Sequence, residues 1–332
     1  MALAVSEERI SRIDVGAAEF EALLACEPAD NWSPCPDLVT PAESARRRLS
    51  AMATQLEHGH CFIRRPDDSS GVEGLVAWSP LAWDSEQFGF PAARIDLLLA
   101  RGDYHTATAI KSQLLTEALE ECGEKGVRHV TARADAAAFS SIHAFERAGF
   151  QTIDQILTFG IRLDGAPALQ HRSWNHVGLF HPKHLDGVLA IARTAYRFDR
   201  FHADPSLPAG VADRLHEAWM RNSCLHGGAD AVFVATVEDK VASYVTVKLD
   251  RGAPGAWLAT IVLVATADWA RGRGMAREAT LASLDWCREQ GVAAVQVGTQ
   301  LRNVAASRLY ENCGFRFAGG SISLRKVLGG AS

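Results

Sequence analysis

The feature that most constrains the fold of this chain is an internal repeat, because its second half follows its first at an offset of 165 residues. The segments EKGVRHV (124–130) and EQGVAAV (289–295) each lead from a glycine to a Gly-Phe pair 23 residues later. The alignment needs no gap and indicates a duplicated domain. The matched residues are Gly126, Gly149 and Phe150 in the first half and Gly291, Gly314 and Phe315 in the second.

Each half also shows the same order of predicted elements. Apolar residues at helical spacing predict one helix containing Ile110–Cys122 and another containing Met275–Trp286. Short apolar stretches before and after these helices predict strands at 93–100 and 127–132, and again at 257–265 and 292–299. Each half therefore reads strand, helix, strand, helix, strand, which is an α/β domain with a mixed sheet.

The length of 332 residues fits two such domains at roughly 150 residues each. Gly165, Ala166 and Pro167 interrupt the periodic pattern, so we expect the boundary within Asp164–His171. The predicted domains are 1–165 and 172–332.

The composition excludes several classes of protein. With 48% apolar and 22% charged residues and a net charge of −5, the chain is typical of a soluble globular protein without a general positive field for nucleic acid. The N-terminus lacks a signal-peptide pattern, and no apolar stretch is long enough to span a membrane. The seven cysteines form no C-x-x-C pair, and the histidines lack metal-ligand spacing. We expect a cytoplasmic monomer or homodimer with reduced thiols and no metal, nucleic acid or membrane partner.

A glycine-rich loop precedes the long helix of the second half. Glycines there allow close approach of the backbone to an anion, and the N–H groups of the helix N-terminus point at it. Such a loop can hold a pyrophosphate, although an ordinary glycine turn with solvated arginines fits this segment equally well. Its residues are Arg271, Gly272, Arg273, Gly274, Met275 and Ala276.

A second motif lies on the next helix. Asn303 suits a helix N-cap and Gly314 a stop beyond the C-terminus. Tyr310 is seven residues from Asn303, nearly two turns, so the two share one helix face. By itself this pattern fits a buried tyrosine bonded to a backbone carbonyl.

Together the two motifs are specific. The pattern R-x-x-G-x-A followed by N-x-x-A-x-x-L-Y-x-x-x-G-F resembles the acyl-CoA-binding core of the GNAT acyltransferase superfamily, over about Trp257–Phe315. The resemblance implies a tandem GNAT fold, with acetyl-CoA or another short acyl-CoA as co-substrate. It also implies that the amides of the glycine-rich loop bind the CoA pyrophosphate, that Asn303 contacts the pantetheine, and that Tyr310 protonates the departing thiolate. The strand backbone at Leu263, Val264 and Ala265 would bind the pantetheine and polarise the thioester carbonyl.

General chemistry agrees with these implied roles. A thiol of pKa about 8.5 leaves more readily when a phenol of pKa about 10 donates a proton, an effect worth roughly 10²- to 10⁴-fold. At the offset of 165, Tyr310 corresponds to Phe145 and Asn303 to Ala138, while the loop corresponds to Thr106–Lys111. The first half therefore reads as a degenerate copy without CoA binding.

Two further segments are candidates for the acceptor site, and both are predicted to be loops: Trp83–Gly89 and Arg200–Pro205. Structural turns are the alternative. With the VGTQLRN segment before Asn303, they resemble the dTDP-4-amino-4,6-dideoxygalactose (dTDP-fucosamine) acetyltransferases, loosely over Leu81–Lys326. This resemblance implies a nucleotide-linked amino-deoxysugar acceptor, bound with help from the first domain.

Candidate roles follow for the side chains of these segments. His202, Asp204 and Asp84 are candidates to receive the ammonium proton of the acceptor. Trp83, Phe88 and Phe201 could stack on a base or sugar, and Arg200 could pair with the diphosphate. Two alternatives remain open: a GNAT enzyme for a small free amine, an amino acid or an aminoglycoside, and a non-catalytic acyl-CoA sensor.

Overall fold

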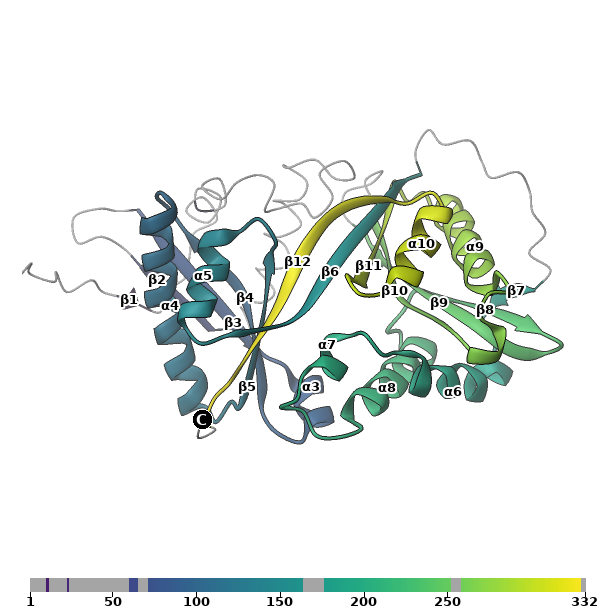
Figure 1. The fold of residues 1–332 in the computed structure, drawn as a ribbon, viewed down its shortest axis with the longest axis horizontal. Helices are drawn as coiled ribbons and strands as arrows, with labels where there is room; N and C mark the ends of the chain where they lie inside the picture. Colours follow the sequence, from purple (N-terminus) through teal and green to yellow (C-terminus); the bar gives the residue numbers. More distant parts are fainter. Residues whose placement is uncertain are drawn as a thin grey trace, which may run out of the picture. The chain divides into compact units, whose positions relative to one another are not determined.

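The computed structural model describes residues 10–11, 23, 60–64, 71–163, 176–251 and 258–329 (Figure 1). By its internal contacts the chain divides into two compact units. The first unit is Met1–Gln155 with Gly320–Ser332, and the second is Ile156–Gly319. Of the helices in the described ranges, none is both long and apolar enough to cross a bilayer.

The first unit is an α/β layer with strand order β1-β2-β3-β4-β5-β12. Only β4 and β5 pair in parallel; the other neighbouring strands in this set are antiparallel. Helices α4 and α5 bury Leu114 and Phe145 against this sheet. Its elements are β1 (Ile10–Ser11), β2 (His60–Arg64), β3 (Gly74–Pro80), α3 (Ala82–Phe88), β4 (Ala92–Ala100), α4 (Tyr104–Glu124), β5 (His129–Asp135), α5 (Phe139–Arg147) and β12 (Arg316–Val327).

The second unit has the same plan, with strand order β6-β11-β10-β9-β8-β7. Only β10 and β11 pair in parallel within it. Its elements are β6 (Gln151–Arg162), β7 (Val177–Leu179), η2 (Pro182–His184), α6 (Leu185–Ala195), α7 (Arg200–Ala203), α8 (Val211–Leu225), β8 (Ala231–Val237), β9 (Lys240–Asp250), β10 (Leu258–Thr266), η3 (Asp268–Ala270), α9 (Met275–Glu289), β11 (Ala294–Gln300) and α10 (Val304–Asn312).

The repeat predicted from the sequence is confirmed as a structural duplication. The elements β5, α5 and β6 start at residues 129, 139 and 151, and β11, α10 and β12 start at 294, 304 and 316, each 165 residues later. The matched glycines also share the left-handed backbone conformation that glycine favours. Their φ angles are 73° at Gly126 and 74° at Gly291, and 80° at Gly149 and 93° at Gly314.

The final strand of each half completes the sheet of the other half. Strand β6 is encoded at the end of the first half, but its residues 156–162 pair with β11. Strand β12 ends the second half, and its residues 321–327 pair with β5. The units therefore change within these strands, at 155/156 and 319/320, and not at the predicted boundary between 1–165 and 172–332. The predicted linker, Asp164–His171, lies outside the described residues.

Two local predictions were wrong. The segments around Trp83 and Arg200 were expected to be loops, but the structure places them in the short helices α3 and α7. In α7 the carboxylate of Asp199 caps the helix by accepting the backbone N–H groups of Phe201 and His202. Helix α3 ends at Gly89, which has φ 78°.

The strand exchange predicts which unit each core residue stabilises. Leu324 of β12 is buried in the first unit's core and Phe159 of β6 in the second unit's core. We expect Leu324→Ala to lower the free energy of unfolding by about 2–5 kcal/mol and to raise the rate of amide exchange in α4. Phe159→Ala should lower the free energy of unfolding by about 3–5 kcal/mol and raise the rate of amide exchange in α9. Hydrogen–deuterium exchange read by mass spectrometry checks this. If Leu324→Ala loosened α9 more than α4, the exchanged pairing would be refuted.

Candidate active site

Two neighbouring strands of the second unit diverge and leave backbone groups without a strand partner. Strands β10 and β11 pair only over Leu258–Ile261 and Ala294–Val297, although β10 runs on to Thr266 and β11 to Gln300. The register of β10 against β9 shifts after Ile261, so Val262 is the extra residue of a bulge. A gap therefore opens along the inner edges of β10 and β11.

The bulge decides which backbone groups face this gap. The Leu263 N–H donates to Oγ1 of Thr246 at 2.9 Å, and the Ala265 carbonyl accepts from Oγ of Ser243 at 2.7 Å, so both residues direct their polar groups to β9. Because successive strand residues direct these groups to opposite neighbours, the N–H and C=O of Val264 point toward β11. Of the three strand residues predicted to bind the pantetheine, Val264 is the one that faces the gap.

The glycine-rich loop lies between β10 and α9. Gly272 and Gly274 have φ angles of 75° and 81°, and a Cβ built on either would meet no atom within 4 Å. Their conformation, and not tight packing, requires glycine. Helix α9 starts at Met275, so the amides of its first turn have no partner within the helix.

Positive side chains surround this loop. The Arg271 guanidinium is exposed and lies 2.8 Å from Asp268. Lys240 Nζ is 4.7 Å and Arg273 Cζ 5.9 Å from the ring centre of Trp269. The loop thus combines backbone donors, a helix N-terminus and cations, which together suit an anionic group.

Helix α10 carries Asn303 and Tyr310. Asn303 is the predicted N-cap, and its Oδ1 accepts the Ala306 N–H at 3.2 Å. Tyr310 is 4% exposed and its ring packs 6.0 Å from Phe159 of β6 and 5.9 Å from Phe315. Burial raises the pKa of Tyr310 well above the usual value for a phenol. The side chain is therefore a neutral phenol that can donate a proton.

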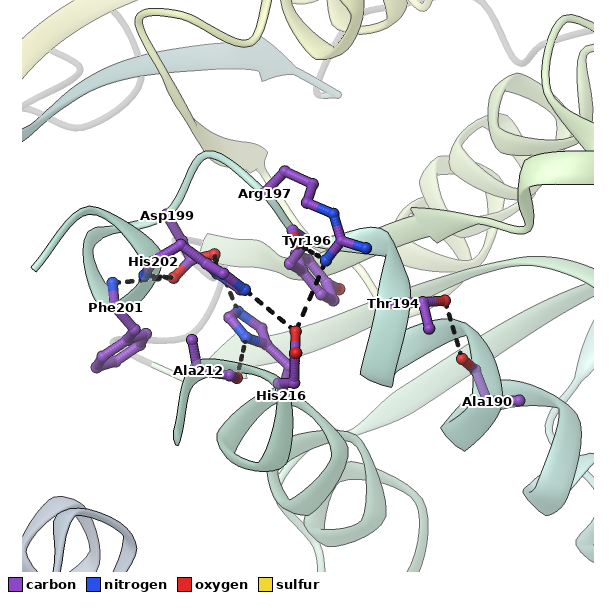
Figure 2. A network of polar contacts seen from close by, with 10 residues as sticks. Ala190, Thr194, Tyr196, Arg197, Asp199, Phe201, His202, Ala212 and His216 are labelled. Carbon is purple, nitrogen blue, oxygen red and sulfur yellow. Dashed lines mark hydrogen bonds and ion pairs between the residues drawn. The ribbon is translucent and has the colours of Figure 1, made fainter. Parts of the chain in front are cut away.

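A cluster of two carboxylates and two imidazoles lies around α7 and α8 (Figure 2). Asp199 Oδ2 is 2.6 Å from Nδ1 of His202 and 3.8 Å from Nε2 of His216. His202 Nε2 is 3.1 Å from Oδ1 of Asp213. Of these four residues only His202 is among the candidates predicted from the sequence. The Asp-x-x-His spacing at the start of a capped helix is a local sequence signal for Asp199. No local spacing indicates His216, because the packing of α8 places it beside Asp199.

Two tyrosines lie beside this cluster. The ring of Tyr196 stacks on that of His216 with centres 4.1 Å apart, and its hydroxyl lies 3.1 Å from that of Tyr244 on β9. Burial, and then the nearby Tyr244, Tyr310 and Asp199, raise the pKa of Tyr196. Burial lowers the pKa of His216, although the charge of Asp199 opposes this effect. His216 is therefore held as a neutral base.

The remaining predicted residues of α7 are already in local contacts. Asp204 is buried, and its Oδ1 accepts from the N–H of Ser206 at 2.9 Å and from its hydroxyl at 2.6 Å. The Arg200 guanidinium lies 4.5 Å from the ring centre of Phe201. Asp204 thus helps to hold the turn after α7, whereas Arg200 and Phe201 present a cation and an aromatic face together.

The predicted acceptor residues of the first unit all lie on α3. Trp83 is 37% exposed and Asp84 is partly exposed. Phe88 is buried, with its ring centre 5.7 Å from that of Phe90 and 5.6 Å from that of His129. Phe88 therefore packs inside its unit, and Trp83 is the aromatic side chain of α3 that a ligand can reach.

The first unit keeps the backbone of the site but not its chemical groups. Strands β4 and β5 also pair over only four residues each, and β4 has a bulge opposite the Ala77/Trp78 step. Phe145, at the position of Tyr310, has no hydroxyl. Lys111, at the position of Ala276, is fully buried, and its Nζ donates to the hydroxyls of Ser140 and Ser141 at 3.0 and 2.9 Å.

Comparison with known proteins gives one family and several relatives. Residues 191–315 match the acetyltransferase (GNAT) family. The spore coat polysaccharide biosynthesis protein SpsD of Bacillus subtilis (strain 168) is 21% identical over 250 residues, which cover 75% of this chain and 82% of SpsD.

Solved structures match nearly the whole chain. A tandem GNAT protein from the clavulanic acid biosynthesis pathway is 15% identical with a TM-score of 0.61, and the match covers 98% of this chain and 100% of that protein. A GCN5-related N-acetyltransferase from Sphaerobacter thermophilus matches with the same identity and TM-score, over 98% of this chain and 97% of its own. The chain therefore has the tandem GNAT fold.

The lowered pKa of His216 predicts a pH dependence of stability. As the pH falls below about 6.5, the unfolded chain takes up a proton at this residue while the folded chain does not, so the free energy of unfolding decreases by up to about 1.4 kcal/mol per pH unit. His216→Asn removes this contribution. We expect the variant to lose less stability than the wild type between pH 6.5 and 5, measured by urea unfolding. His226→Asn at the exposed end of α8 is the control, and parallel pH profiles for wild type and His216→Asn would contradict the prediction.

Proposed function

We propose that this chain, whose residues 191–315 match the acetyltransferase (GNAT) family, transfers an acetyl group from acetyl-CoA to the amino group of a nucleotide-linked amino-deoxysugar. The observation that carries the acyltransferase part is the buried neutral phenol of Tyr310 in the unit that also contains the strand gap and the glycine-rich loop. The first unit has the same backbone without these groups, so we assign one active site to each chain.

The second unit offers binding partners for the pyrophosphate, the pantetheine and the thioester of acetyl-CoA. The amides of Arg271–Ala276 and the N-terminus of α9 bind the pyrophosphate. The pantetheine lies along the edge of β10, where the N–H of Val264 faces the gap, and the amide of Asn303 contacts its arm. In this position the Val264 N–H also polarises the thioester carbonyl and stabilises the oxyanion of the tetrahedral intermediate.

The reaction then needs no covalent enzyme intermediate. The neutral amine attacks the thioester carbon, the C–N bond forms, and the tetrahedral intermediate collapses by breaking the C–S bond. Tyr310 donates its proton to the departing thiolate, and the proton that the attacking nitrogen loses as the amide forms returns Tyr310 to the phenol. Burial by Phe159 and Phe315 suits this role, because it keeps the phenol protonated until the thiolate develops.

A sugar acceptor is supported by two observations. Arg200 and Phe201 together present a cation for a diphosphate and a ring for a base or pyranose. The relative SpsD is named for spore coat polysaccharide biosynthesis, which favours a sugar over an amino acid. Trp83 and Asp84 of α3 remain our candidates for further acceptor contacts.

A thiol-release assay with acetyl-CoA tests the whole proposal. The acceptor panel contains dTDP-4-amino-4,6-dideoxygalactose, glucosamine, aminoglycosides and free amino acids. We expect the nucleotide-linked sugar to give the largest kcat/KM. A larger value for an aminoglycoside or amino acid would refute the sugar assignment, and no thiol release above hydrolysis with any amine would refute the transferase assignment.

Tyr310→Phe tests the general acid. We expect kcat to fall by about 10²-fold or more, because the proton donor is lost while the ring still packs on Phe159. The KM for acetyl-CoA should stay within a few-fold. Steady-state kinetics on the best acceptor of the panel provide the measurement.

Tyr104→Phe is the matched control for this variant, since it removes a phenol hydroxyl from α4, where the hydroxyl bonds His143. It should leave kcat unchanged. Turnover of Tyr310→Phe close to that of the wild type would assign the phenol of Tyr310 to structure instead of catalysis.

Alanine substitutions at two glycines distinguish a loss of CoA binding from the general effect of backbone strain. Gly274 and Gly291 lie at opposite ends of α9, have φ angles of 81° and 74°, and have open space where a Cβ would be. Alanine at either position costs about 1–2 kcal/mol of strain. Only Gly274→Ala should also weaken CoA binding, by about tenfold or more, because it shifts the amides that face the pyrophosphate.

Titration calorimetry with CoA measures this difference. We expect one site per chain in the wild type and in Gly291→Ala, and a weaker site in Gly274→Ala. Equal affinities for the two variants would place the pyrophosphate elsewhere, and two sites of similar affinity in the wild type would contradict a degenerate first half.

A further inference from the structure

The proposed reaction leaves one proton over in every turnover. Near neutral pH a primary amine such as that of lysine is an ammonium ion, because its pKa is about 10.4. Ammonium and acyl thioester give amide, free thiol and one proton that must reach the solvent. Tyr310 supplies the thiol's proton, but nothing in the proposed mechanism so far takes up the proton of the ammonium.

Four side chains of the second unit follow one another at 2.6–3.8 Å, and Figure 2 labels three of them, Asp199, His202 and His216. The contacts run from His216 to Asp199 at 3.8 Å, from Asp199 to His202 at 2.6 Å, and from His202 to Asp213 at 3.1 Å. Side-chain exposure increases at each step, from 3% through 11% and 21% to 43%. The array of these four side chains therefore has a buried end at His216, which we call the dry end, and a solvent-exposed end at Asp213.

The other polar atoms of these groups are anchored. His216 donates its Nδ1–H to the carbonyl of Ala212 at 2.8 Å, which leaves the lone pair of Nε2 facing Asp199. Asp199 Oδ1 accepts two backbone N–H groups of α7, at 2.9 and 3.2 Å. Asp213 is also 3.7 Å from the guanidinium of Arg197. These contacts hold the four side chains in fixed positions relative to α7 and α8.

The dry end adjoins the part of the sheet where we place the thioester. The ring of His216 stacks on Tyr196, and the Tyr196 hydroxyl lies 3.1 Å from that of Tyr244. Tyr244 is the cross-strand partner of Ala265, the residue after Val264. The rings of Phe201 and Trp219, at 6.0 and 6.3 Å, also surround His216 and keep water from it.

We propose that His216, Asp199, His202 and Asp213 form a proton-exit array that accepts the proton of the acceptor ammonium and releases it to solvent. This inference rests on the proposed function. An N–H bond of the ammonium breaks and an N–H bond forms at Nε2 of His216, with the imidazolium stabilised by Asp199. The proton then passes through the Asp199–His202 pair and leaves to water at Asp213, which returns His216 to its neutral form.

His216 is the member best suited to store the proton. The groups that face it are Asp199, His202, Asp213 and Tyr196, and Arg197 faces Asp213. Burial keeps its resting form neutral, while Asp199 lies close enough to stabilise the charged form when a proton arrives. Asp199 and His202 act on His216 as positioning residues, and they also transmit the proton.

His216→Asn tests the array, because an asparagine amide can still donate to the Ala212 carbonyl but offers no Nε2. With acetyl-CoA and dTDP-4-amino-4,6-dideoxygalactose, or the best amine of the panel, we expect kcat/KM at pH 7 to fall at least tenfold. At pH 9.5, where the amine supplies more of its own neutral form, the loss should shrink to about threefold or less. CoA affinity by calorimetry should not change. Asp199→Asn should give the same pH-dependent loss, and His226→Asn on the same helix should behave as the wild type.

Two results would overturn the array. One is a wild-type rate for His216→Asn at pH 7, and the other is an equal loss at every pH, which would assign His216 to structure. Nitrogen-detected NMR of the histidine rings in the full chain provides a readout that needs no turnover. We expect His216 to be the neutral Nδ1–H tautomer at pH 7 and its titration to move in Asp199→Asn.

The NMR experiment also separates this inference from the proposed function. If the wild type acetylates no amine, the transferase assignment fails by itself. The proposal of the array would fail separately if His216 were already protonated at pH 7, or if its titration were the same in Asp199→Asn as in the wild type.

Discussion

The two halves of the chain exchange their final strands, and each set of strands is complete only with the one that it receives. Without β6, strand β11 would have an unpaired edge, and without β12 the same would hold for β5. The consequence reaches the active site, because Phe159 of β6 is one of the rings that bury Tyr310. The first half of the sequence therefore supplies part of the wall around the proposed general acid.

The site itself lies where sheet pairing ends. The divergence of β10 and β11 and the bulge at Val262 turn backbone groups, which the sheet would otherwise pair, toward a ligand. In the first unit β4 and β5 also pair over only four residues, and β4 has a bulge against β3. Divergent strands are thus a property of the duplicated fold. What distinguishes the two units is the side chains: Tyr310 against Phe145, and the open glycine-rich loop against the buried Lys111.

In the second unit, burial shifts the pKa values of an acid and a base in opposite directions. Burial keeps Tyr310 protonated and His216 neutral, so one holds a proton to give and the other has a lone pair to receive one. Tyr196, an uncharged phenol, stacks on His216 and is close enough to Tyr310 to interact with it electrostatically. This arrangement lets one direct-attack reaction use a proton donor and a proton acceptor at neutral pH.

The duplication, the mixed α/β class, the long helices and the position of Tyr310 could be predicted from the sequence. These features are encoded in local patterns: helical spacing in α9, the cap at Asn303 and the left-handed glycines at 291 and 314. Local patterns also located the glycine-rich loop, whose conformation depends on residues that adjoin in the chain.

Which strands complete each unit and which groups meet around His216 depends on contacts between distant segments of the chain. A strand's edge does not specify its partner, so the division at 155/156 could not be found from the linker signal near Pro167. The helices α3 and α7 were missed because each is too short for its periodicity to be seen, and α7 depends on the cap by Asp199. Asp199 and His216 are 17 residues apart, and packing of α8 against α7 joins them, since no local spacing brings a carboxylate and an imidazole together over that distance.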